Sequence, residues 1–193
     1  GAKTSWQAVH TVDSSTPNGS ASFNISFEDP AGNTGTVVTQ TDDDSSVKID
    51  TTAPSVTEAT IVSSNADTGY GKHDDTVTLT FTTSEPVRDL AAADLEIEGL
   101  ANLSVRSLND GKTQWEVTGV VDEDLVEAPQ SGGGGGSSTA AFSITVLDNA
   151  GNRGSPKTTT TDQTSVTLDT TAPTLSSVTL ASNNASTNRA KSG

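Results

Sequence analysis

Short stretches of the chain alternate between apolar and polar residues, which is the pattern of β-strands with one buried face. The apolar residues at every second position are Ala59 and Ile61; Val77, Leu79 and Phe81; Leu95 and Ile97; Leu103 and Val105; Trp115 and Val117; Phe142, Ile144 and Val146; and Val166 and Leu168. No stretch of useful length has a helical period, although Ala91–Asp94 can form one helical turn. The pattern predicts an all-β fold.

Turn residues separate these strands. Asn109–Gly111 and Ala150–Gly154 are rich in Asn, Asp and Gly, which suit turns with positive φ. From about residue 54 to residue 170 the pattern gives seven or eight strands, which is typical of an antiparallel sandwich of immunoglobulin (Ig) type. We expect the core of this sandwich to hold Val77, Leu79, Phe81, Trp115, Val117, Phe142, Ile144 and Val146.

An internal repeat organises the whole chain. Residues 21–66 align with residues 140–185 without a gap at an offset of 119, and Trp6 matches Trp115 at an offset of 109. The later copy therefore carries ten extra residues, around the glycine run 132–136, whose role the sequence leaves open. We interpret residues 52–170 as a complete Ig-like domain. Residues 1–51 are then the C-terminal part of a preceding domain, and residues 171–193 the first strand of a following one.

The two end segments lack counterparts of residues 75–109, so each would leave open strand edges and an apolar face. We expect the chain to be a window from a longer polypeptide. The open edges would be covered by further chain or by strands from a neighbouring subunit.

Composition narrows the class of protein. Val, Leu, Ile and Phe make up only 37 of 193 residues and the net charge is −15, which alone borders on disorder. The constant spacing of the repeat argues against a disordered stalk. The negative charge argues against nucleic-acid binding, and no apolar run is long enough for membrane insertion of this segment. The absence of Cys excludes disulfides, thiolate zinc sites and Cys nucleophiles.

Several motifs together resemble a known family. They are Asp50-Thr51-Thr52-Ala53-Pro54, which recurs at 169–173; Ser84-Glu85-Pro86-Val87; and Asp148-Asn149-Ala150-Gly151-Asn152. This set resembles the bacterial Ig-like domains repeated in large extracellular adhesins and surface proteins. The resemblance implies tandem Ig-like sandwiches at the cell surface, with neighbouring repeats of the same chain as partners. Similar modules occur in appendages of eukaryotic microbes, so the source organism stays open.

Signatures of catalysis are weak, and we expect no enzyme. His10 and His73 are the only histidines, lie in non-matching parts of the repeat, and are interpreted as solvated. Gly111–Thr113 resembles the end of a phosphate-binding loop, but Arg106 stands where that motif requires glycine. Glu85, before Pro86, is interpreted as marking a strand end or a bulge.

Calcium binding is the sharper chemical hypothesis, because Ca²⁺ prefers six to eight oxygen ligands. Two acidic positions recur with the repeat, Asp29 with Asp148 and Asp50 with Asp169. Related modules are often stiffened by Ca²⁺ between domains. We therefore predict Ca²⁺ at the junctions, held by Asp29 and Asp50 at the earlier one and by Asp148 and Asp169 at the later one. The alternative is that these residues only cap their own turns.

Other polar and aromatic residues have simpler interpretations. Asp67, Asp74 and Asp75 lie in a loop that is a further source of ligands across a junction, whereas the acidic runs 42–44 and 122–124 are interpreted as solvated. Trp6 and Trp115 are interpreted as core residues. Asn-x-Ser sequons occur at Asn18, Asn24, Asn102 and Asn184. If the source is eukaryotic, we expect these four residues to be glycosylation sites.

Three functions remain in competition. The first is a rod or spacer segment of a large extracellular adhesin-type protein. The second is the repeating subunit of an extracellular filament or appendage, in which identical subunits are partners. The third is a carbohydrate- or ligand-binding accessory module of a secreted protein.

Overall fold

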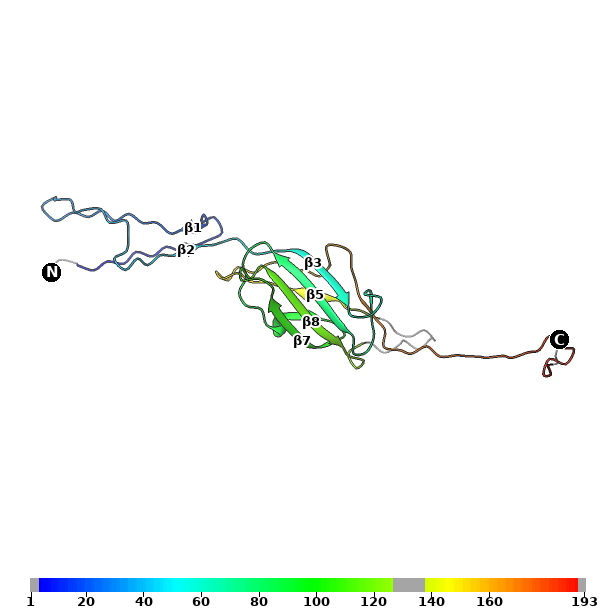
Figure 1. Ribbon diagram of the computed structural model, residues 1–193. Helices are drawn as coiled ribbons and strands as arrows, with labels where there is room; N and C mark the ends of the chain where they lie inside the picture. The colour runs from blue at the N-terminus through cyan, green and yellow to red at the C-terminus, as the bar shows by residue number, and fades with distance from the viewer. Residues whose placement is uncertain (1–3, 127–137, 191–193) are drawn as a thin grey trace.

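The computed structural model describes residues 4–126 and 138–190, and within these residues the chain is all-β (Figure 1). The only helical element in the described part is the 3₁₀ turn η1, Ala92–Asp94, where one helical turn was predicted. No helix of the described residues is long and apolar enough to cross a membrane. The glycine run 132–136 lies outside the described residues. The strands are β1 (Gly19–Ser20), β2 (Lys48–Ile49), β3 (Val56–Ser63), β4 (Tyr70–Gly71), β5 (Thr76–Thr83), β6 (Leu95–Ile97), β7 (Leu100–Ser107), β8 (Gln114–Val121), β9 (Ser138–Thr139), β10 (Phe142–Ile144) and β11 (Thr167–Leu168).

The largest sheet has four antiparallel strands in the order β3-β5-β8-β7. One of its two central strands, β5, alternates buried apolar residues with half-buried threonines, so the pleat sends Val77, Leu79 and Phe81 to one face. On the opposite face Thr60 and Thr80 share a hydrogen bond of 2.7 Å across the β3–β5 pair. The period-two pattern of the sequence therefore corresponds directly to the two faces of this sheet.

Smaller sheets complete the middle of the chain. Strand β10 pairs with β6 in antiparallel fashion, and β11 lies between β9, antiparallel to it, and β4, parallel to it. Buried residues of these strands belong to one hydrophobic cluster with those of the four-stranded sheet. The cluster includes Leu95, Phe142, Ile144 and Leu168 from the smaller sheets. One core thus joins strands from the first and second halves of residues 54–170.

The predicted core residues are confirmed. All eight side chains named from the alternation are at most 8% exposed. Trp115 is among them, and its indole Nε1 donates to the Lys112 backbone oxygen at 3.1 Å, so its polar atom is satisfied. The matching interpretation of Trp6 as a core residue is wrong, because this side chain is 80% exposed.

The repeat seen in the sequence is also a repeat of structure. Residues 19–49 reproduce the hydrogen bonds of residues 138–168, including the pairing of β1 with β2, which matches that of β9 with β11 at the same offset. The matching backbone bonds are Asp29 to Asn33 with Asp148 to Asn152, Gly35 to Phe27 with Gly154 to Val146, Ile25 to Val38 with Ile144 to Lys157, and Ala21 to Val47 with Ala140 to Val166. Residues 19–49 therefore have the same backbone hydrogen-bond pattern as residues 138–168.

The apolar residues of this N-terminal segment are less buried than their counterparts in the later copy. Phe23, Ile25 and Phe27 are 40–54% exposed, whereas their counterparts Phe142, Ile144 and Val146 are buried. Trp6 differs from its counterpart Trp115 in the same way, since Trp6 is exposed and Trp115 is buried. Figure 1 shows residues 4–51 extending from one end of the compact middle part and the C-terminal tail from the other.

The turns differ from expectation in one detail. In the β7–β8 hairpin the positive φ falls on Lys112, at 50°, and not on Gly111. At the Ala150–Gly154 turn the expectation holds, because Gly151 has a φ of 96°.

The repeat supplies a matched pair of core mutations. We expect Ile144→Ala to lower the free energy of unfolding by about 2–5 kcal/mol, because it empties a fully buried site. The equivalent Ile25→Ala should cost less than about 1 kcal/mol, since Ile25 is half exposed. Urea denaturation followed by Trp fluorescence measures both, and equal losses would contradict the packing described above.

Candidate metal centre

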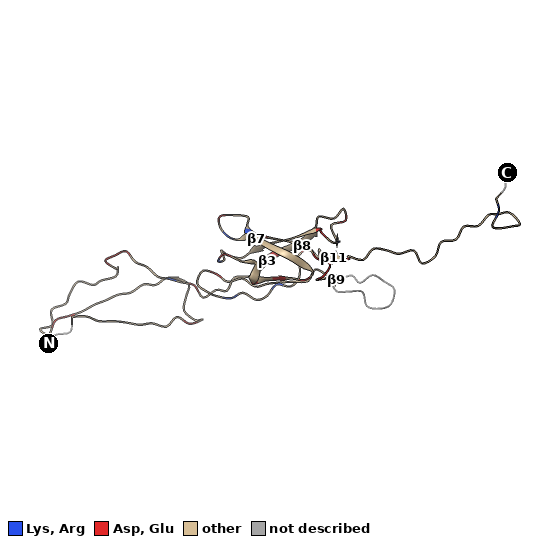
Figure 2. Cartoon of the chain, turned by 90° about the horizontal axis from the view of Figure 1, so that it is seen from below, with Lys and Arg blue, Asp and Glu red and all other residues tan. Residues whose placement is uncertain are grey.

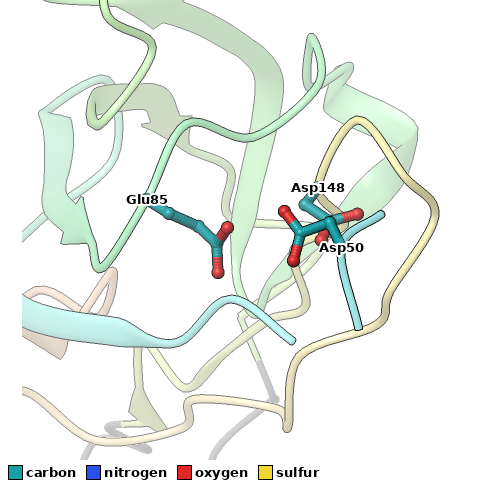
Figure 3. Close-up of side chains that lie close together, drawn as sticks. All are labelled: Asp50, Glu85 and Asp148. Atoms are coloured by element: carbon teal, nitrogen blue, oxygen red, sulfur yellow. The ribbon is translucent and has the colours of Figure 1, made fainter. Parts of the chain in front are cut away.

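Three carboxylates from separate segments meet beside the start of the compact middle part. Asp50 follows β2, Glu85 follows β5 and Asp148 lies in the loop after β10. One oxygen of each lies within 4.8 Å of the others, and Figure 3 shows the three carboxylates facing one another. They line a pocket of about 340 Å³ together with Lys48, Pro86, Asn149 and Ala150. We call these three residues the junction carboxylates.

Glu85 is placed by the end of β5. The Thr83 hydroxyl donates to the Glu85 backbone oxygen at 2.7 Å, and Pro86 then prevents the strand from continuing its ladder. The chain next forms a bridge between Val87 and Asp148, and Arg88 N donates to Leu147 O at 3.0 Å. These contacts hold the Glu85 turn against the loop that carries Asp148.

Asp148 is buried and organises its own turn. Its Oδ1 accepts the backbone N–H groups of Gly151 and Asn152, at 2.7 and 2.8 Å, and its Oδ2 accepts Asn152 Nδ2 at 2.7 Å. These bonds use three of the roughly four acceptor positions of a carboxylate. One position on Oδ2 remains for a cation, so turn capping and metal binding are compatible at this residue.

Asp50 is held by contacts from both sides. Asn18 Nδ2 and Thr52 N donate to Asp50 Oδ1, each at 3.1 Å, and Oδ2 accepts no hydrogen bond within the described residues. Asn152 Nδ2 also donates to the Asp50 backbone oxygen at 3.0 Å. Asn152 therefore connects Asp50 to Asp148 directly.

The surroundings of Glu85 and Asp148 shift the pKa values of these two side chains. Burial raises the pKa of Glu85 above its ordinary value, and the negative charges of Asp50 and Asp148 raise it further, while Lys48 opposes them. Burial also acts to raise the pKa of Asp148, but hydrogen bonds from Asn152 and Gly151 outweigh it and leave that pKa lowered. The charged form is therefore favoured at Asp148 and disfavoured at Glu85. A proton or a cation at the site would relieve the crowding of negative charge.

The residues predicted for calcium are grouped differently in the structure. We expected Asp29 with Asp50 and Asp148 with Asp169, whereas the structure brings Asp50 to Asp148. Asp29 is exposed and accepts bonds from Ala31 N and from Asn33, and Asp169 Oδ1 accepts Thr171 N. Within the described residues, neither Asp29 nor Asp169 belongs to a group of three possible metal ligands. Both have the turn-capping contacts of the alternative interpretation.

Glu85 was interpreted only as a strand end, and sequence reasoning missed its place among the carboxylates. Recurrence within the repeat identified the aspartates. That signal could not reveal Glu85, because its counterpart would fall among the positions that the end segments lack. The proline after it was the available sign that this side chain leaves the sheet at a fixed point.

Other predicted positions lie elsewhere. Asp75 caps the loop before β5 through Asn65 Nδ2 and Lys72 N, and it is not grouped with Asp169 among the described residues. The histidines and the acidic runs 42–44 and 122–124 are largely exposed. Of the sequons, Asn24 and Asn102 are exposed, Asn184 is half-buried, and the exposed Asn18 is hydrogen-bonded to the segment after β2.

Comparison with known proteins adds no assignment, because no family model, curated protein or solved structure matches this chain.

The two copies of the Asp–Asn turn allow a test of its structural weight. We expect Asp148→Ala to lower the free energy of unfolding by about 2–4 kcal/mol, since it removes three hydrogen bonds at a buried site. The equivalent Asp29→Ala should have a much smaller effect, because that turn is exposed.

The lowered pKa of Asp148 fixes the sign of the pH dependence. Its stabilising contribution is present above the ordinary pKa of 3.8 and is lost as the pH falls through the lowered value. The Asp148→Ala chain should therefore lose less stability on acidification than the unchanged chain. Thermal melts between about pH 2 and pH 6 measure this difference.

Proposed function

We propose that this chain is a structural segment of a large extracellular or cell-surface protein, in which Ig-like sandwiches follow one another in a rod. The observation that carries this proposal is the segment 50–55, which we call the linker. The linker is hydrogen-bonded both to the half-unit before it and to the complete unit after it. A connector fixed on both sides suits a spacer that must hold its direction.

The interpretation of residues 54–170 as an Ig-like sandwich rests on the sheets and their shared core. A four-stranded antiparallel sheet and a set of smaller sheets bury one hydrophobic cluster between them, without any disulfide. Two sheets with interdigitating inner faces define the sandwich class. The resemblance of the sequence motifs to Ig-like repeats of adhesins supports the same reading.

On its N-terminal side the linker is held by one amide. Asn18 Nδ2 donates to Asp50 Oδ1 and to Thr52 Oγ1, and Asn18 Oδ1 accepts the Thr51 backbone N–H and hydroxyl. The donor and acceptor atoms of a single side chain are thus engaged by three successive linker residues. This arrangement makes residues 50–52 a fixed extension of the half-unit.

On its C-terminal side the linker is seated on the complete unit. Pro54 is fully buried, and a side chain at Gly154 would meet the Pro54 backbone oxygen at 2.3 Å, so only glycine fits there. Ser84 N donates to Ser55 O at 2.8 Å, and Ser55 N donates to Ser84 Oγ at 3.0 Å. Figure 1 shows an elongated chain with its ends on opposite sides, which suits a spacer.

The net negative charge of the chain is consistent with a protein that is surrounded by water. Figure 2 shows acidic residues along the chain and few basic ones, in keeping with the net charge of −15. Such a surface favours solubility and opposes nonspecific association.

Calcium is the cation we propose for the junction carboxylates. Carboxylate oxygens are hard ligands that suit Ca²⁺, and the three side chains supply part of the six to eight oxygens it needs. The site joins the linker to two loops of the complete unit, so a bound ion would add a bridge across the junction. Lys48 lines the same pocket and would weaken binding by its charge.

Calcium should raise the melting temperature of the chain relative to chelator, as any ligand of the native state does. In metal-free buffer Glu85→Gln should raise the melting temperature, because this change removes the desolvated charge that faces Asp50 and Asp148. The same variant should lose the calcium-dependent rise, whereas Lys48→Gln should reach half of that rise at lower calcium.

The control is Glu123→Gln, an exposed acid outside the site. Calorimetric scans with and without calcium measure all four chains. An equal calcium effect in the unchanged and Glu85→Gln chains would reject the site.

Removal of the linker contacts should loosen the junction. We expect Asn18→Ala combined with Asn152→Ala to broaden the distances between spin labels placed on β1 and β8, without unfolding the core. The matched control is Asn33→Ala, which removes the bond to Asp29 but touches no linker residue. Because the chain has no Cys, two introduced cysteines label uniquely. An unchanged distance distribution in the double variant would mean that these contacts do not fix the joint.

A filament subunit is the second candidate. The observation that favours it is the exposed apolar residues in both end segments, which include Phe27 in the first and Leu180 in the second. Such surfaces suit contact with identical subunits. Under either role, the chain acts by shape and contact and not by catalysis.

A further inference from the structure

We propose that Asn18 is a modification site, at which the side-chain amide is lost as ammonia when the linker opens. The linker contacts protect Asn18 while the junction is closed, and the modified residue can no longer hold the junction. This inference adds a site of spontaneous chemistry, and it depends neither on calcium nor on the spacer role.

Asn18 is distinguished by the residue that follows it. Of the 11 asparagines in the sequence, only Asn18 is followed by glycine. An asparagine loses its amide through a five-membered ring that includes the next backbone nitrogen, and a glycine leaves that nitrogen unobstructed because it has no side chain. Asn18 is also exposed, so water can reach it. It is therefore the asparagine of this chain that is most prone to the reaction.

The reaction needs water and no other reagent. The backbone nitrogen of Gly19 bonds to Cγ of Asn18, the bond from Cγ to Nδ2 breaks, and Nδ2 leaves as ammonia with the proton of the Gly19 nitrogen. Water then opens the ring. Attack on Cγ gives aspartate, and attack on the backbone carbonyl carbon of residue 18 gives isoaspartate. Either product carries a carboxylate in place of a neutral amide.

The amide that would be lost is the group that fixes the linker. Asn18 Nδ2 donates to Asp50 Oδ1 at 3.1 Å and to Thr52 Oγ1 at 2.8 Å, so both of its hydrogens are used. Asn18 Oδ1 accepts the backbone N–H and the hydroxyl of Thr51, each at 2.8 Å. Both donated bonds must break before Nδ2 can leave as ammonia. The closed linker therefore protects Asn18.

The attacking nitrogen is restrained as well. Gly19 pairs with Ile49 in the antiparallel ladder of β1 and β2, and its φ is 139°. Figure 1 shows this ladder next to the start of the compact middle part. Ring closure turns the Gly19 nitrogen towards the Asn18 side chain, and the ladder opposes that rotation. We therefore expect the reaction to follow a local opening of the ladder and the linker.

The modified residue would keep the junction from closing again. A carboxylate only accepts hydrogen bonds, so it cannot donate to Asp50 Oδ1 as the amide does. It would also place a negative charge next to the Asp50 carboxylate, at a contact that is now a hydrogen bond of 3.1 Å. Isoaspartate adds one carbon to the backbone directly before β1. A reversible opening would thereby become permanent.

The sequence restricts this chemistry to one copy of the repeat. At the offset of 119, Ser137 and Ser138 stand in place of Asn18 and Gly19. Serine has no amide to lose, so the later copy has no equivalent site. The reaction would therefore act on one of two otherwise matching segments.

The first test follows amide loss at Asn18 by peptide mapping and mass spectrometry while the full chain is incubated in mildly alkaline buffer. Asn18 should react roughly tenfold more slowly in the folded chain than in a synthetic peptide of residues 12–26, because several hydrogen bonds must open first. Thr51→Val combined with Thr52→Val should raise the rate in the folded chain by roughly fivefold, since it removes two side-chain contacts to the amide. The control is Thr57→Val, which removes a hydroxyl contact on β3 and leaves Asn18 unchanged.

The second test supplies the product directly. Asn18→Asp should broaden the distances between spin labels attached at Thr39→Cys and Ser104→Cys, whereas Asn24→Asp, the same change at an exposed asparagine outside the linker contacts, should leave them narrow.

Three results would overturn the proposal. They are equal rates at Asn18 in the folded chain and the peptide, equal rates in the double threonine variant and the Thr57→Val control, and unchanged distances in the Asn18→Asp chain. The rates report chemistry at one amide, so their failure would leave the spacer role and the calcium site untouched.

Discussion

The compact middle part of this molecule depends on one hydrophobic core that draws residues from strands far apart in the sequence. Phe81 and Trp115 from the first half and Ile144 and Val146 from the second are buried in one cluster. Residues 4–51 keep the hydrogen-bonded turns of the later copy but leave Phe23, Ile25 and Phe27 exposed. Local backbone pairing and core burial are therefore separable here, and only burial makes the middle part compact.

The Asp–Asn turn shows how one local device has different consequences in two settings. In both copies a carboxylate accepts bonds from the asparagine backbone and side chain four residues later. The Asn33 amide, which donates to Asp29, is exposed to solvent. The Asn152 amide beside Asp148 also donates to the Asp50 backbone oxygen in the linker. The same turn therefore connects two parts of the chain and holds Asp148 beside Asp50.

Much of this was accessible from the sequence, because period-two alternation reports directly on which strand face is buried. The eight core residues follow from that pattern, and the shared hydrogen bonds follow from the repeat. The partners of Asp50 did not follow, since they depend on how the linker meets the next unit and on Glu85, which the repeat does not sample. The prediction that Trp6 is buried was wrong, because a match within the repeat gives a residue's position but not the side chains that pack around it.

The buried seat of Pro54 also determines how the chain would respond to a pulling force. Tension entering along residues 50–55 reaches the complete unit first through the Asn152 bond to Asp50 and the two bonds between Ser55 and Ser84. Behind them, β3 is held along the long ladder with β5 and by the threonine contacts at residues 161 and 164. Because fewer hydrogen bonds hold residues 50–55 than hold β3, we expect these residues to detach first under such a force. The four-stranded sheet and its core would then stay closed while the linker straightens.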